Sequence, residues 1–296
     1  MRSKIIVAVV GLLVIAVSAQ TPPTESTERV VQLVHTPTSR GFEQMATVLR
    51  AVAQLLTLTI DSEHNSFVLD GTPDDLAMAE WLIHMMDKPA GWRPSDQEIW
   101  NPATREFRAT AGREPVVRVC YLSHTQAPLG SQELITLVRT VADVHKIFCY
   151  DPASVVAFRG SAESVELAEW LIRKLDLPSS AQAVEASGQE SGANLYRLTA
   201  RQRDGSEDLV RVFYLNPGVS PPGIQEMITA MRKRASIQRV FSHTTPPAIA
   251  ARGNAAKLAE AQRIIEGMET AGARCDLTPN PQFRLKSFRL AKARTP

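Results

Sequence analysis

The residue types that could carry chemistry in this chain are its six histidines, its three cysteines and its paired acids. No two histidines have the i, i+4 spacing that would place both imidazoles on one helix face for a metal. The sequence also lacks a Gly-x-Ser-x-Gly elbow, a Cys-x-x-Cys pair and a glycine-rich phosphate loop. Asp74 and Asp75 are adjacent, and adjacent positions on a helix do not face one another. We therefore predict that the protein is not an enzyme and binds no cofactor or metal.

The elements that position the side chains belong to a repeated unit. The segment Ala79–Ile83 recurs letter for letter at 168–172, and a diverged copy occupies 261–265. The glycines upstream of these segments, at 71, 160 and 253, lie 89 and 93 residues apart. With these offsets the downstream apolar positions align at the helical spacing of three and four residues. The sequence thus predicts three copies of one module, and copied modules usually bind or assemble.

Each copy marks the start of its second helix in the same way. A glycine that is expected to make the strand-to-helix turn is followed directly by a residue whose side chain can cap a helix. These pairs are Gly71 and Thr72, Gly160 and Ser161, and Gly253 and Asn254. Pro89 and Pro178 then end the helices of the first two copies, because proline cannot continue a helix.

Strand-like runs and a second apolar helix pattern complete each copy in the order strand, helix, strand, strand, helix. The predicted class is α+β, with three βαββα modules that each have a three-stranded sheet and two helices on one face. The expected segments are a signal peptide (1–19), module 1 (29–89), a linker (90–115), module 2 (116–178), a flexible linker (179–207), module 3 (208–270) and a basic tail (271–296). Residues 194–203 could add a strand to module 3.

The runs Val210–Pro217 and Ala250–Gly253 resemble the short N-terminal domain of bacterial secretins, also called the NolW-like domain. Val117–Leu122 and the ending Leu171–Pro178 of module 2 are similar to the same pattern. The resemblance implies modules that stack side by side in the periplasm and contact other envelope proteins. No segment for a secretin pore follows module 3, so we expect a protein other than the pore itself. The module shape is also KH-like, but no copy has the Gly-x-x-Gly loop of KH domains.

The first nineteen residues have the features of a secretory signal. Arg2 and Lys4 precede the apolar run Ile5–Val17, and Val17-Ser18-Ala19 forms a small-residue cleavage site. We therefore expect export to the periplasm of a Gram-negative envelope, with outer-membrane association or secretion as further possibilities. Retention of the segment as an uncleaved anchor also stays open.

The charge balance argues against nucleic acid as a partner. Without Arg2 and Lys4 the chain has 31 basic and 31 acidic residues, so its net charge is near zero. The tail 271–296 is the basic exception. It can be a solvated tail or a contact to an acidic partner or to lipid head groups.

Several further residues are candidates for structural or interfacial roles. Trp81 and Trp170 either flank the core or contact another module or a partner. The strands around Val119 and Val212 are predicted to have exposed edges, which are templates for pairing with neighbours.

The cysteines leave two possibilities open in an exported chain. Cys120 and Cys149 lie on two strand segments of module 2, so they either form a disulfide or stay buried thiols. Cys275, at the start of the tail, is the candidate free thiol.

These observations favour a non-enzymatic envelope protein that mediates protein–protein assembly, in connection with a secretion or type IV pilus apparatus. Its expected partners are envelope proteins, including a secretin or pilus component, and it could form a homo-oligomer. The alternative is a periplasmic protein that binds peptidoglycan or another ligand, with Trp92 and Trp100 of the linker stacking on sugars.

Overall fold

The computed structural model describes residues 27–36, 38–89, 92, 95, 101–110, 114–178 and 193–275. The predicted signal peptide, Trp100 and all but the first residues of the predicted basic tail lie outside these ranges. Within them, no helix combines the length and the apolar character that a membrane span requires.

The first unit is a three-stranded antiparallel sheet with two helical segments. Its order in space is β1-β3-β2. The elements are β1 (Thr27–Gln32), α1 (Ser39–Val48) with a π-helical continuation η1 (Leu49–Ala53), β2 (Thr57–Asp61), β3 (Ser66–Gly71) and α2 (Pro73–Met86).

The second and third units each have a four-stranded antiparallel sheet, with the orders β4-β5-β7-β6 and β10-β11-β9-β8. The second comprises α4 (Pro102–Arg105), β4 (Glu106–Arg108), β5 (Val116–Tyr121), α5 (Leu129–Ala142), β6 (Lys146–Tyr150), the turn η2 (Asp151–Ala153), β7 (Val155–Gly160) and α6 (Ala162–Leu175). The third comprises β8 (Leu195–Arg201), β9 (Glu207–Tyr214), α8 (Pro221–Arg234), β10 (Arg239–His243), β11 (Ala248–Gly253) and α9 (Ala255–Cys275).

The α+β class is confirmed, but the prediction of three strands per sheet is wrong for the second and third units. The additional strands are β4 and β8, which pair antiparallel with β5 and β9. Both come from segments predicted as linkers. They add to the sheets because β5 and β9 would otherwise present unpaired backbone groups along a free edge. The sequence indicated that 194–203 could add a strand, which corresponds to β8, but it indicated no strand at the position of β4.

The polar residues that precede the last long helix of each unit cap its amino-terminal end in all three units. Thr72, Ser161 and Asn254 accept hydrogen bonds from the backbone N–H three residues on, at 3.2, 3.2 and 3.0 Å. The glycine before each cap ends a strand, and none of these three has a left-handed φ. At Gly71 a Cβ would lie 3.0 Å from Leu55 Cδ2, so a larger residue there would require the Leu55 side chain to shift.

Two further contacts recur at offsets of 89 and 93 residues. An arginine of the first long helix donates to a carbonyl of the second strand, in the pairs Arg50 to Leu58, Arg139 to Ile147 and Arg232 to Val240. A carboxylate at or near the end of the second helix accepts from backbone N–H groups after the first strand, in the pairs Asp87 with Val34, Asp176 with Ser123, and Glu269 with Asn216. These contacts tie the helices of each unit to its own strands.

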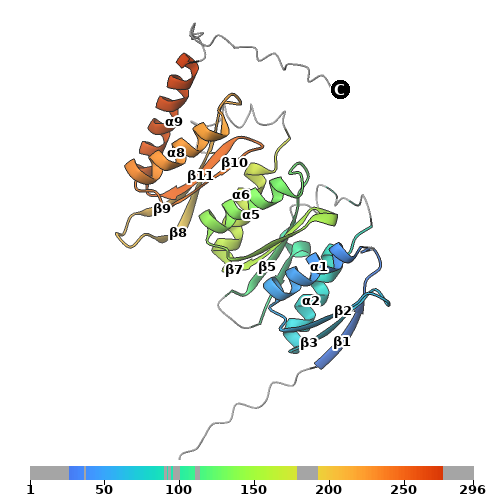
Figure 1. The fold of residues 1–296 in the computed structure, drawn as a ribbon. Coiled ribbons are helices and arrows are strands. Elements are labelled where there is room, and N and C mark those ends of the chain that lie inside the picture. The colour runs from blue at the N-terminus through green and yellow to red at the C-terminus, as the bar shows by residue number, and fades with distance from the viewer. Residues whose placement is uncertain are drawn as a thin grey trace, which may run out of the picture.

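The units stack so that layers of helices and layers of strands alternate along the molecule (Figure 1). One face of the second sheet packs on its own helices, and the other face joins the core of the first unit through Val117, Val119, Tyr121, Val155 and Ala157. The third sheet joins the core of the second unit in the same way, through Val210, Val212, Tyr214, Ala248 and Ala250. The apolar cores are therefore continuous across both contacts between units.

Candidate functional site

We call the contact between the first and second units the first joint, and that between the second and third units the second joint. A tyrosine of the incoming sheet reaches the last turn of the preceding helix in both. The Tyr121 hydroxyl donates to the Met85 carbonyl at 3.0 Å, and the Tyr214 hydroxyl donates to the Lys174 carbonyl at 2.6 Å. Backbone carbonyls in the last turn of a helix lack helical partners, so these bonds satisfy groups that would otherwise need water.

An arginine adds a second equivalent contact to each joint. Arg159 Nη1 lies 3.3 Å from the Val52 carbonyl oxygen, and Arg252 Nη1 lies 3.2 Å from the Val141 carbonyl oxygen. Arg252 is also held by Asp208 at 2.6 Å. The two guanidinium groups thus bind the carboxyl ends of the preceding helical segments, where the helix dipole favours a cation.

A polar pair closes each joint on one side. In the first joint Gln44 Nε2 donates to Asp151 at 2.8 Å. In the second, Glu133 accepts from the Thr244 hydroxyl and backbone N–H at 2.8 and 3.0 Å. In the first joint the acid, Asp151, belongs to the following unit, whereas in the second joint the acid, Glu133, belongs to the preceding unit. The two pairs nevertheless occupy equivalent positions of the repeat.

Both predicted interface tryptophans lie against the added strand of the following unit. Trp81 stacks near Phe107 of β4, with ring centroids 5.8 Å apart, and Trp170 lies near Tyr196 of β8 at 5.5 Å. The equivalent Arg263 of the third unit pairs with Glu260 on its own helix. Both tryptophans also pack against the core of their own unit.

The predicted exposed edges at Val119 and Val212 are wrong. Both side chains are fully buried in the joints, and both strands have neighbours on each side. The Val119 carbonyl accepts from Arg105 Nη1 at 2.9 Å, and the Val212 N–H donates to the Asn194 carbonyl at 3.0 Å. The segments that precede these units occupy the edges, so no backbone groups are left there for pairing with a neighbour.

A disulfide between Cys120 and Cys149 is also excluded, because both are free thiols in the structure. Each lies opposite Val156, on either side of the central strand β7. Two strand spacings separate the cysteines by about 10 Å, which is beyond the reach of a disulfide. Burial raises the pKa of both thiols to about 12, so neither is a reactive thiolate. The side chain of Cys275 lies outside the described part.

A buried ion cluster attaches the segment before β5 to the second unit. Glu169 of α6 binds both Arg105 and Arg118, and Arg118 also binds Glu106 of β4. Burial alone would raise the pKa of Glu169, but the hydrogen bond and charge of Arg105, with the charge of Arg118, lower it. The repeat offsets relate Arg118 and Glu169 to the exposed pair of Arg29 and Glu80. Arg105 has no counterpart in that pattern, so repeat reasoning missed the cluster.

The described residues contain no group of three or more metal-ligating side chains. Trp92, which had been considered for stacking on sugars, packs edge-on against Tyr121 with centroids 5.1 Å apart and has Lys88 over its ring. The ring is therefore engaged in the first joint. Within the described ranges, no contact favours a sugar-binding role.

We expect Tyr121→Phe and Tyr214→Phe to lower the free energy of unfolding by about 1 kcal/mol each. Each change removes one hydroxyl and leaves a helix-end carbonyl without its donor. Chemical denaturation of the chain from residue 20 onward would measure both losses. Tyr196→Phe, whose ring contacts Trp170, is the control and should retain stability if its ring alone matters.

No protein-family model and no curated protein matches the chain. Among solved structures it is similar to the N-terminal domain of the secretin XcpQ from Pseudomonas aeruginosa, at 13% identity over 51% of this chain and 62% of that chain, with a TM-score of 0.22. It is also similar to Aeromonas hydrophila ExeD, at 14% identity over 83% of this chain and 41% of that chain, with a TM-score of 0.18. A protein of unknown function from Aeropyrum pernix, APE0754, is 15% identical over 51% of this chain and 83% of that chain, with a TM-score of 0.26. The chain thus spans less than two thirds of the length of the first two.

Proposed function

We propose that this chain is a non-enzymatic, exported protein of the Gram-negative periplasm that mediates protein–protein assembly. The observation that carries the proposal is the recurrence of one joint, with equivalent tyrosine and arginine contacts, between successive units. Such joints fix the units relative to one another, so the chain presents its surfaces at set spacings, as repeat proteins do when they bind partners. The resemblance of Val210–Pro217 and Val117–Leu122 to secretin N-terminal modules favours a secretion or type IV pilus apparatus as the setting.

The first unit offers the surface for a partner. Among the described residues, four large apolar side chains are exposed, and three of them belong to this unit: Val30, Val34 and Leu56. Within the described part of the chain, no helical layer lies against the outer face of its sheet, whereas the second and third sheets are covered on both sides (Figure 1). Val30 lies on this face, whereas Val34 and Leu56 lie in segments next to β1 and β2, and exposed apolar groups of this kind are typical of interaction sites.

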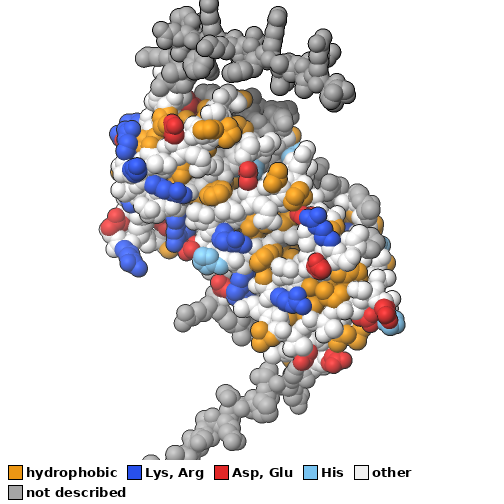
Figure 2. Space-filling view, in the orientation of Figure 1, with side chains coloured by type: hydrophobic (Ala, Val, Ile, Leu, Met, Phe, Trp, Pro, Cys, Tyr) orange, Lys and Arg blue, Asp and Glu red, His pale blue; other side chains and the backbone are white. Residues whose placement is uncertain are grey.

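The third unit ends the stack with a different chemistry. The last turn of α8 has Arg232, Lys233 and Arg234. Basic side chains outnumber acidic ones over this unit on the face that Figure 2 shows. We infer that an acidic protein surface or lipid head groups would contact this end, where the basic tail also begins.

A photo-crosslinking amino acid at position 34 or 56 of the full chain, expressed in its native envelope, tests the assembly role. We expect a discrete crosslinked envelope protein from these positions and none from position 166, which is exposed on α6 of the second unit. Light scattering of the exported chain across a concentration series shows whether that partner is a second copy. A strictly monomeric chain without any crosslink at 34 or 56 would exclude the proposal.

A further inference from the structure

The two joints differ at one pair of equivalent positions, which are Thr36 with Tyr150 in the first and Thr125 with His243 in the second. In the first joint the Tyr150 hydroxyl lies 2.9 Å from Thr36 Oγ1, which itself donates to Asp87 at 2.8 Å. Because threonine has a single hydroxyl proton, Tyr150 is the donor to Thr36. The phenol ring is 2% exposed, so it fills this part of the first joint with its hydrogen bond made.

In the second joint the equivalent side chains are not bonded to each other, and one buried atom of each has no partner among the described residues. His243 is 1% exposed, and its Nδ1 lies 3.2 Å from the Pro246 carbonyl oxygen, which makes Nδ1 the protonated nitrogen. Its Nε2 is therefore an acceptor, and no described residue donates to it. The buried Thr125 Oγ1 is likewise without a partner in the described ranges. Native structures rarely bury such atoms unpaired, because each then loses its hydration without compensation.

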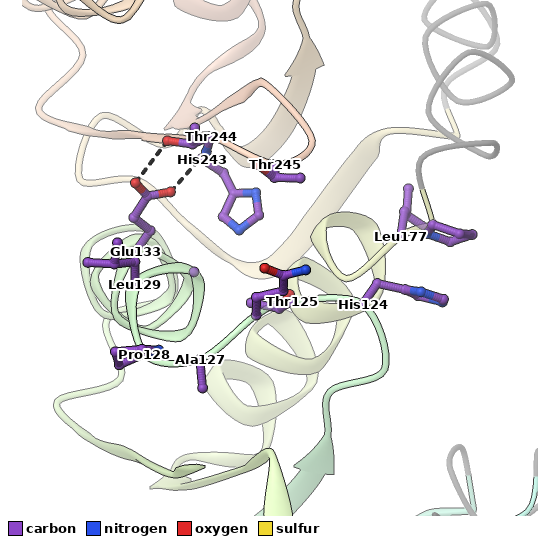
Figure 3. A pocket seen from close by; sticks show the side chains of 13 residues that line it. His124, Thr125, Ala127, Pro128, Leu129, Glu133, Leu177, His243, Thr244 and Thr245 are labelled. Atoms are coloured by element: carbon purple, nitrogen blue, oxygen red, sulfur yellow. Dashed lines mark hydrogen bonds between the residues drawn. The ribbon is translucent and has the colours of Figure 1, made fainter.

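Both residues line a pocket of about 590 Å³ between the second and third units, and their unpartnered atoms lie just beneath its wall, shielded from solvent. In Figure 3 the His243 ring extends from β10 toward Thr125, while Glu133 turns to Thr244. The apolar part of the lining is formed by Ala127, Pro128, Leu129, Leu177 and Pro178. Pockets of this volume with apolar walls and a few polar groups are typical of small-molecule sites.

The residues that line the pocket favour an uncharged ligand group. Burial lowers the pKa of His243, so its imidazole is uncharged at pH 7. Among the described residues no lysine or arginine lines the pocket, so none of them would offset a carboxylate or a phosphate. The Glu133 carboxylate already accepts two hydrogen bonds from Thr244, with which an organic cation would have to compete.

We propose that this pocket binds a phenolic group toward which the His243 and Thr125 side chains turn, so that its hydroxyl donates to His243 Nε2 and accepts from Thr125 Oγ1. The ligand would supply in the second joint what the Tyr150 side chain supplies in the first. An aliphatic alcohol would pair with the same atoms but would leave the apolar walls uncovered. The phenol can belong to a free small molecule or to a tyrosine of a partner protein. This site goes beyond the assembly role and does not depend on it.

The first experiment titrates the exported chain with p-cresol while side-chain ¹⁵N spectra of its histidines are recorded. We expect a saturable shift of the His243 Nε2 signal with a dissociation constant on the order of 1 mM, given the few atoms of this ligand. Toluene has the same ring without the hydroxyl and should leave this signal in place. A second arm uses N-acetyltyrosinamide: a shift supports access for a protein tyrosine, and no shift restricts the site to free phenols.

Two variants assign the effect to the pocket. His243→Tyr introduces the residue of the first joint, so we expect it to raise Tm and to abolish the further rise of Tm that p-cresol gives. Thr125→Val should weaken p-cresol binding about tenfold, since one hydrogen bond is lost. Thr36→Val, the matched change in the first joint, should leave binding unchanged. The proposal fails if p-cresol gives no shift or if toluene gives the same shift. It also fails if Thr125→Val binds p-cresol as tightly as the parent and the Thr36→Val control do.

Discussion

Val119→Asp is expected to lower the free energy of unfolding by about 3–5 kcal/mol, because it places an uncompensated charge inside the first joint. Val119 is fully buried and packs among apolar side chains of both units. The substituted carboxylate would be cut off from water, and the arginine at this residue, Arg105, is already bound to Glu169 and to the Val119 carbonyl. We expect the first unit to separate from the second, which hydrogen exchange would report as lost protection at Met85 and Tyr121. Chemical denaturation gives the magnitude.

Val30 provides the matched control, since it occupies the equivalent position in the first sheet, 89 residues earlier. Its side chain is 62% exposed on the face that no unit covers. Val30→Asp should therefore cost less than about 1 kcal/mol, within the range of strand propensity differences. Equal losses in the two variants would contradict the role of Val119 in the joint.

Glu169→Ala is expected to destabilise the second unit by about 3–5 kcal/mol, because it leaves buried arginines without their shared carboxylate. Arg105 and Arg118 are 1% and 7% exposed. Arg118 would retain Glu106, whereas Arg105 would lose the carboxylate that it binds and keep its contacts with the Val119 carbonyl and Cys120. Thermal and chemical unfolding of the exported chain would measure the loss.

The repeat again supplies controls for this prediction. Glu80→Ala removes the equivalent acid from the exposed pair with Arg29, and such surface pairs contribute at most about 1 kcal/mol. Glu169→Gln should retain part of the stability, since Gln262 accepts from Arg211 at 2.8 Å in the third unit. If Glu80→Ala proves as costly as Glu169→Ala, burial does not govern the strength of these pairs.

The local order of elements within each unit was predictable because its signals are local. The caps at Thr72, Ser161 and Asn254 and the apolar helix stripes depend only on residues a few positions apart. The contacts between units were not predictable in this way. Val119 and Val212 carry no mark that distinguishes an open edge from a buried one, since the outcome depends on segments that precede the module.

The same reasoning explains the error on the linkers. The composition of 90–115 and 179–207 predicts connectors, with a strand considered only at 194–203, where β8 forms; the pairing of β4 with β5 has no such signal. A strand of three residues such as β4 is too short for periodicity to reveal. The pair of His243 and Thr125 could not be predicted from sequence either. Only alignment of the second joint with the first shows that an imidazole stands where the first joint has a phenol.

The uncovered outer face of the first sheet also indicates which unit folds first. That sheet carries the polar Glu28, Gln32, Thr57 and Asp70 on the face of Val30, so the first unit can form its strands before anything else is present. The outer faces of the second and third sheets are apolar, so these sheets need the packed helices of the preceding unit to cover them. We therefore expect the chain to fold from its amino-terminal end, with the helices of each unit providing the surface on which the sheet of the next unit packs.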